Sequence, residues 1–285
     1  MTVSRLASTA GIQLQGGYIP VKELDITPLC EKQGNYAYMM RKERPNRRIQ
    51  PSVFGVVFGY MLDYEMTLES GQLVSPLSVS SYRIAHKGAL KVGQLSEFDS
   101  CVARIDELYC HNPRDYNAII NEFRRIAIYD TIYRSGFYQL VNEIPMSLTD
   151  SDVKSMCRAV SATKEYLCKT AEEFNFEVGF TGVHSKNILP SDCDLVTDDS
   201  LIDFKCSTKE PNSKQTFQLL LYYLLGKHEC PKMFNKVKYL KIINPLLGNV
   251  YTYDIKKLDT DYVKHILENK IGYPKKICDV ICAKI

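Results

Sequence analysis

Long apolar runs are missing from this chain of 285 residues. Its two most hydrophobic stretches, VFGVVFGYML (53–62) and LLLYYLL (219–225), are too short to cross a bilayer, because a spanning helix needs about 20 apolar residues. The first residues, MTVSRLASTAGIQLQGG, also lack the apolar centre of a secretory signal peptide. We therefore expect a cytoplasmic protein with no membrane-spanning helix.

A disulfide framework and internal repeats are missing as well. The ten cysteines are scattered, without the spacing of a small secreted domain, so we expect reduced thiols in a cytosol. No repeat or low-complexity tract interrupts the chain. Its length and its 45% of hydrophobic residues are enough for one large domain or two ordinary ones.

Charge is unevenly distributed along the chain. The net charge is only +3, but residues 199–285 contain 15 lysines and 9 acidic residues, so this part alone carries +6. Lysines supply most of the sequence-independent affinity for a phosphate backbone. The excess is consistent with a DNA partner and equally with a lysine-rich solvated surface.

The hydrophobic period changes near residue 174. Before it, a period close to 3.6 predicts mostly helices; after it, short alternating runs predict strands around one apolar helix. The expected fold class is therefore α/β (α+β). We expect helices at 51–70, 77–90, 97–110, 115–137, 149–174 and 213–226, and strands at 175–182, within 191–206 and within 236–255.

The segment SDCDLVTDDSLIDFKCS (191–207) contains two apolar runs that are interrupted by charges. Side chains alternate between the two faces of a strand, so Asp203 and Lys205 share a face, and Asp194 lies on the preceding run. The Asp-Asp pair between the runs is typical of a turn. A tight hairpin would therefore place Asp194, Asp203 and Lys205 side by side.

Two carboxylates on adjacent strands repel, and burial costs several kcal/mol per ion unless something compensates. A divalent cation with a preference for oxygen ligands, Mg²⁺ or Mn²⁺, would do so. Lys205 would then add a positive charge that steers a water or stabilises a phosphate. These groups suit phosphodiester hydrolysis, and the alternative is a solvated strand face with a surface ion pair worth about 0–1 kcal/mol.

Together with the next helix, these residues resemble the PD-(D/E)XK nucleases, most closely their RecB-type branch. That family has an aspartate on one strand, then Asp or Glu, any residue and Lys on the next, and a helix with Gln and a Tyr four residues later. Asp194, Asp203, Lys205, Gln218 and Tyr222 fit this pattern. Gln218 and Tyr222 are four residues apart, so they share one helical face.

The resemblance implies a fold and roles for these residues. It implies that Asp194 and Asp203 bind the metal, that Lys205 is catalytic, and that the glutamine helix packs against the site. It also implies a nuclease core of a mixed sheet flanked by helices within 149–285. Residues 1–148 would then form a mostly helical region, a substrate clamp or an oligomer surface, and its helix at 51–70 is a candidate first core helix.

The chain departs from the family in its metal ligands. RecB-type enzymes usually have a histidine four residues after a glycine on the first core helix, and here Gly59 occupies that position. Asp63, one turn further along, or Glu65 could supply an oxygen instead, or both could be solvent-facing helix residues. A glutamate before or within the first strand, Glu172, Glu173 or Glu177, is the other candidate, and the sequence does not rank these residues.

Some RecB-type nucleases hold an iron–sulfur cluster with one upstream and three C-terminal cysteines. The tail here offers Cys278 and Cys282, with Cys230 further back. We do not expect a cluster, because Cys278 and Cys282 are one helical turn apart in a segment of helix-like periodicity and are expected to face the core.

The resulting expectation is a Mg²⁺- or Mn²⁺-dependent deoxyribonuclease. Exonuclease and endonuclease action stay open, as do strand preference and oligomeric state. The alternative is a catalytically inactive nuclease-fold module that binds nucleic acid or another protein. No helicase motif is visible, so unwinding would need a partner; the resemblance suggests settings such as recombination, replication or defence.

Overall fold

The computed structural model describes residues 1–10, 19–31, 33–42, 51–69, 79, 81–136 and 148–285. Contacts divide the chain into two units. Met1–Leu29 and Cys168–Ile285 form one, the sheet unit, and Cys30–Leu167 form the other, the helical unit. No helix in the described ranges is long and apolar enough to span a membrane.

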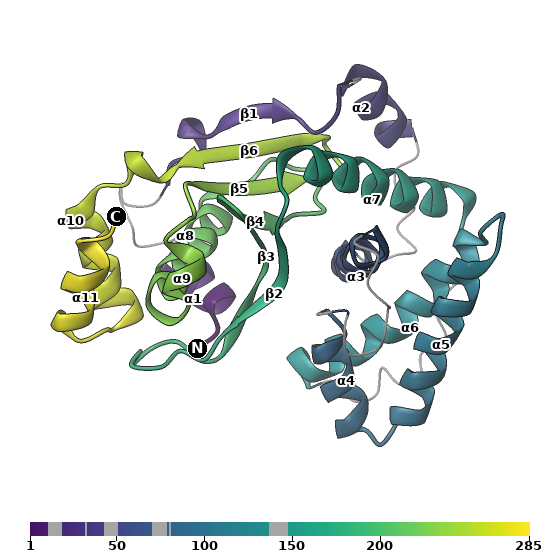
Figure 1. Ribbon diagram of the computed structural model, residues 1–285, viewed down its shortest axis with the longest axis horizontal. Helices are drawn as coiled ribbons and strands as arrows, with labels where there is room; N and C mark the ends of the chain where they lie inside the picture. The colour runs from purple at the N-terminus through teal and green to yellow at the C-terminus, as the bar shows by residue number, and fades with distance from the viewer. Residues whose placement is uncertain (11–18, 32, 43–50, 70–78, 80, 137–147) are drawn as a thin grey trace. The chain divides into compact units, whose positions relative to one another are not determined.

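Six helices make up most of the helical unit (Figure 1). Large aromatic side chains fill its core, among them Tyr64, Tyr82, Phe98 and Phe123, which make edge and tilted ring contacts. The helices are α2 (Gln33–Lys42), α3 (Pro51–Glu69), α4 (Tyr82–Lys91), α5 (Leu95–Cys110), α6 (Tyr116–Ser135) and α7 (Asp150–Thr170), whose last turn crosses into the sheet unit. Part of the helix expected at 77–90 lies outside the described residues.

A mixed sheet of six strands forms the centre of the sheet unit (Figure 1). The order across it is β1-β6-β5-β4-β3-β2; β4 and β5 are parallel, and every other neighbouring pair is antiparallel. The strands are β1 (Asp25–Pro28), β2 (Phe174–Phe180), β3 (Ser191–Thr197), β4 (Ser200–Phe204), β5 (Tyr239–Asn244) and β6 (Asn249–Asp254). The expected mixed α/β class is confirmed at this level.

Helix α8 (Ser213–Glu229) connects β4 to β5. It begins at a capping box, in which the Asn212 side chain accepts from backbone amides and Gln215 bonds back to Asn212. Apolar residues surround its axis, and it packs against β2, β4, β5 and helix α1 (Val3–Ala10). The unit is completed by α9 (Pro231–Phe234), α10 (Thr260–Ile266), α11 (Lys275–Cys282) and three short helical turns, 21–23, 255–257 and 267–271.

The unit boundaries differ from the one that the sequence suggested at residue 149. Residues 1–29 belong with the sheet: β1 pairs with β6, α1 packs on α8, and Thr216 Oγ1 donates to the carbonyl of Ile19 at 2.8 Å. Most of α7 belongs to the helical unit. The four residues of β1 are exposed, so they carry no apolar pattern that would predict this pairing.

The close approach of α8 and α9 predicts that residue 226 must be glycine. A Cβ at Gly226 would overlap the buried ring of Phe234, so Gly226→Ala should destabilise the fold by about 1–3 kcal/mol. At Gly59, also helical, a Cβ meets nothing within 4 Å, and Gly59→Ala should be neutral or stabilise by about 0.4–1 kcal/mol. Urea unfolding of both variants checks this; equal midpoints would contradict it.

Candidate active site

The expected hairpin of β3 and β4 is present. Leu195 pairs with Ile202 and Val196 with Leu201, in antiparallel register. Continuing this register by one residue brings Asp194 opposite Asp203. The two acidic side chains therefore come from neighbouring strands of the same sheet, as the sequence predicted.

Lys205 pairs directly with one of the two acids. Its Nζ lies 2.6 Å from Asp203 Oδ2, and its backbone amide extends the sheet by donating to the carbonyl of Ile243. The Asp203 side chain is 2% exposed and that of Lys205 is 21% exposed, so the ion pair is largely removed from water. The Lys205 ammonium therefore occupies Asp203 Oδ2. An ionised carboxylate has about four lone-pair sites on its two oxygens, so a cation could bind Asp203 beside Lys205.

Asp194 has a different set of contacts. Its Oδ2 accepts a hydrogen bond from the backbone amide of Phe204 at 2.7 Å. Burial, followed by the charge of Asp203, raises the pKa of Asp194 to about 7, although Lys205 and the Phe204 amide act in the opposite direction. Burial also raises the pKa of Asp203, with Lys205 again opposing the shift. One ammonium group therefore compensates two carboxylates only in part.

The two residues expected on α8 lie beside this pair. Gln218 Nε2 donates to the Tyr222 hydroxyl at 3.0 Å and to Ser4 Oγ at 2.9 Å. The Tyr222 ring is buried and stacks on Phe180, with centroids 6.1 Å apart. Burial and then the charges of Asp203 and Asp194 raise the pKa of Tyr222, so its hydroxyl stays protonated. The helix thus presents a neutral donor near the carboxylates, with Gln218 holding it.

Glu177 is the unranked glutamate that the sheet register brings to the site. Phe176 pairs with Leu195 and Val178 with Cys193, which places Glu177 opposite Asp194 on the next strand. Its φ of +49° is unusual for a residue other than glycine and interrupts the strand at this point. Burial raises the pKa of Cys193, and the charges of Asp194 and then Glu177 raise it further.

Two other candidates have different partners. Glu173 is exposed and pairs with Lys236 at 3.5 Å, while its amide donates to Asp198 at the hairpin turn. Asp63 belongs to the helical unit, where its Oδ2 accepts from both the amide and the hydroxyl of Ser81. The register therefore favours Glu177, rather than Glu173, as a third acid beside the pair.

One residue that contacts the site could not be predicted from the sequence. Ser4, in the first turn of α1, bonds to Gln218 across 214 residues of chain. Neither its residue type nor its neighbours distinguish it from other serines. Only the packing of α1 on α8 brings it there.

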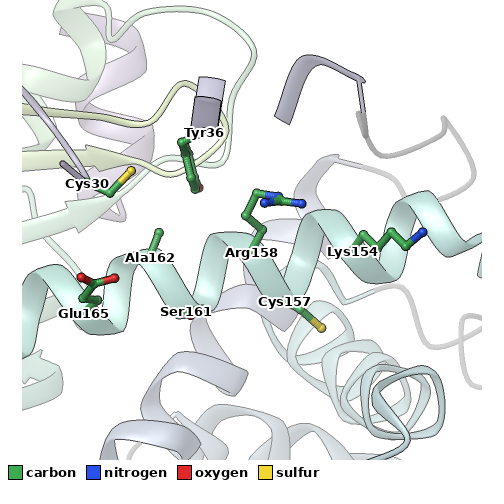
Figure 2. Close-up of a pocket in the computed structure, with 8 residues that line it drawn as sticks. All are labelled: Cys30, Tyr36, Lys154, Cys157, Arg158, Ser161, Ala162 and Glu165. Carbon is green, nitrogen blue, oxygen red and sulfur yellow. The ribbon is translucent and has the colours of Figure 1, made fainter. Parts of the chain in front are cut away.

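The helical unit contains a separate open pocket of about 480 Å³ (Figure 2). Two basic residues, Lys154 and Arg158, project from α7 on its wall, and Glu165 lies two turns after Arg158. The full lining is Cys30, Tyr36, Lys154, Cys157, Arg158, Ser161, Ala162 and Glu165. None of these residues was singled out by the sequence.

A scan against protein-family models finds no match, and searches of curated proteins and of solved structures find no similar protein either.

The pKa of Asp194 predicts how stability depends on pH. Its pKa rises from about 3.9 in the unfolded chain to about 7 in the fold, so between these values the folded state binds more protons. The stabilisation that comes from the protonated Asp194 side chain is complete below about pH 4 and is lost as pH rises through about 7. In EDTA, Asp194→Asn should flatten the fall in stability between about pH 4 and 7, whereas Asp279→Asn, at a side chain 51% exposed, should not. Urea unfolding at each pH measures this; parallel curves for all three proteins would contradict it.

Proposed function

We propose that this chain is a metal-dependent nuclease that hydrolyses phosphodiester bonds of DNA. The observation that carries the proposal is the convergence of Asp194, Asp203 and Lys205 on one face of neighbouring strands, where Asp203 is buried and the other two are half-buried. Burying two carboxylates beside one ammonium is costly unless the charge is used. Perturbed groups of this kind are typical of catalytic sites.

The order of elements along the chain supports the nuclease-like core. Helix α7 precedes strands β2, β3 and β4 and helix α8, and strand β5 follows after the short helix α9. Apart from α9, this is the order of helix, three strands, helix and strand implied by the resemblance to the RecB-type PD-(D/E)XK nucleases. The parallel pairing of β4 and β5 across α8 keeps the acids and Tyr222 together.

The donor set fits Mg²⁺ or Mn²⁺. Carboxylate oxygens are the preferred ligands of these ions, and Mg²⁺ commonly takes only one or two from the protein. Asp194 and Asp203, on neighbouring strands, would be the ligands. The described residues form no group of three or more His, Cys, Asp or Glu that could hold an ion. A metal at Asp203 would share this carboxylate with Lys205, whose Nζ lies 2.6 Å from Oδ2. When bound, the ion would supply Lewis-acid stabilisation of charge on the phosphate.

The remaining groups have distinct roles in the proposed reaction. Lys205 stays protonated, because the charges of Asp203 and Asp194 together outweigh the effect of burial and raise its pKa. Its ammonium would stabilise negative charge that develops on the phosphate and orient the attacking water. The protonated Tyr222 hydroxyl can donate a hydrogen bond to the substrate, and Gln218 keeps it oriented. Exposed lysines among the 15 of residues 199–285 would hold the DNA backbone; Lys205 and the buried Lys227 are not among them.

The inactive binding module is the second candidate. The ion pair of Lys205 with Asp203 favours it, because it neutralises one carboxylate without any metal. Such a module would still bind nucleic acid through its lysines but would cleave none. The two experiments below separate the two candidates.

Removing either charged group should abolish cleavage. We expect Asp203→Asn and Lys205→Met each to lower DNA hydrolysis by at least about 100-fold, because each removes charge stabilisation from the transition state. The control is Asp279→Asn, which breaks an exposed ion pair with Lys264 and should cleave like the wild type. The readout is cleavage of labelled single- and double-stranded DNA in Mg²⁺ or Mn²⁺, with circular dichroism to check folding. Normal cleavage by a folded Asp203→Asn protein would refute the mechanism.

Metal binding should stabilise the folded protein. A ligand that binds only the native state adds RT ln(1 + [L]/Kd), about 2.7 kcal/mol at a hundredfold excess over Kd. We expect Mn²⁺ to raise the melting temperature of the wild type and of Asp279→Asn. Asp203→Asn keeps the shape but removes one carboxylate charge, so it should lose most of the shift. A full shift in Asp203→Asn, or none in the wild type, would make the inactive module the better interpretation.

A further inference from the structure

Two histidines that are far apart in the sequence meet outside the carboxylate site. His184 lies in the loop between β2 and β3, and His228 lies in the last turn of α8. His184 Nδ1 is 3.1 Å from His228 Nε2, and the ring centroids are 5.4 Å apart. No step of the proposed cleavage uses either residue.

The loop that carries His184 is held tightly on both sides of it. The Glu229 carboxylate accepts hydrogen bonds from the amide and hydroxyl of Thr181 and from the amide of Gly182, at 2.7–2.9 Å. Ser185 Oγ donates to the carbonyl of Ile271 at 2.6 Å. These bonds fix the loop to α8 and to the segment before α11. The backbone on both sides of His184 is therefore held in place.

The two histidines are themselves constrained. His184 has a φ of +66°, a backbone conformation that is uncommon for residues other than glycine and that clusters at functional positions. The half-buried His228 ring packs edge-to-face on the buried Tyr273 at 4.9 Å. Burial and the nearby His184 lower the pKa of His228, although Glu229 opposes this, which favours the neutral imidazole that binds metals.

We propose that His184 Nδ1 and His228 Nε2 together bind a divalent transition metal such as Zn²⁺, which links the β2–β3 loop to the end of α8. Two nitrogens bound to one tetrahedral Zn²⁺ at about 2.0–2.1 Å lie about 3.3 Å apart. The observed 3.1 Å needs an adjustment of only about 0.2 Å. Because His184 is exposed, water can complete the shell.

Binding a metal at the two histidines requires no net release of a proton. Without a metal, one hydrogen lies between the two inner nitrogens, so one ring donates and the other accepts. On binding, that hydrogen moves to the outer nitrogen of its own ring, both inner lone pairs bind the ion, and no proton is lost. Imidazole selects Zn²⁺, Cu²⁺ or Ni²⁺ over Mg²⁺, which distinguishes this site from the carboxylate pair.

Isothermal titration of the full chain with Zn²⁺ alone tests the proposal. The proteins are the wild type, His184→Gln, His228→Gln and the control His265→Gln, whose ring contacts Asn269 instead. Removing a residue that hydrogen-bonds to a metal ligand lowers metal affinity by about 10–100-fold. Removing a ligand itself should therefore weaken Zn²⁺ binding at this site by at least about 100-fold. None of the variants changes a cysteine, so any Zn²⁺ bound by thiols is the same in all four proteins and the difference between them isolates the histidines.

We expect one tight site in the wild type and in His265→Gln that both other variants lose. Equal stoichiometry and affinity in all four proteins would overturn the proposal and leave a pair that only shares a proton. Equal loss in His265→Gln would overturn it too. Mg²⁺-dependent DNA cleavage by His184→Gln should match the wild type, so failure here is distinguishable from failure of the proposed nuclease activity.

Discussion

The burial of α8 is the constraint on which the rest of the sheet unit depends. This helix is apolar on nearly every side, so it needs partners all around: strands β2, β4 and β5 on one side, and helices α1 and α11 elsewhere. Because it connects β4 to β5 as a crossover, those strands run parallel. The same helix carries Gln218 and Tyr222 to the carboxylates and His228 to the β2–β3 loop.

That packing creates an electrostatic conflict. Asp203 lies two residues after Leu201, on the same face of β4, and Leu201 belongs to the apolar cluster around α8. The two carboxylates are therefore held in a poorly hydrated place with one lysine for compensation. A core filled by apolar side chains would be cheaper to bury. The raised pKa of Asp194 is the direct expression of this conflict, and a cation would relieve it.

Elements determined by near neighbours could be predicted from the sequence. The hairpin of β3 and β4 needs only alternation and a turn, so the proximity of Asp194, Asp203 and Lys205 followed from 12 residues of chain. Helix α8 follows from its apolar run and from Asn212 and Gln215 at its start. Gln218 and Tyr222 meet because helical residues four apart share a face.

Contacts between distant segments were decided only by the tertiary structure. The exposed strand β1 and the helix α1 join the sheet unit through pairing with β6 and packing on α8, and nothing in their own residues predicts this. The sequence does not rank Glu172, Glu173 and Glu177, and only the register of β2 against β3 separates Glu177 from Glu173. By itself, then, the sequence determined the local helices and strands and the proximity of Asp194, Asp203 and Lys205. The fold decided which further residues, Ser4, Glu177 and the two histidines among them, lie near one another, because those contacts depend on how separate elements pack rather than on their spacing in the chain.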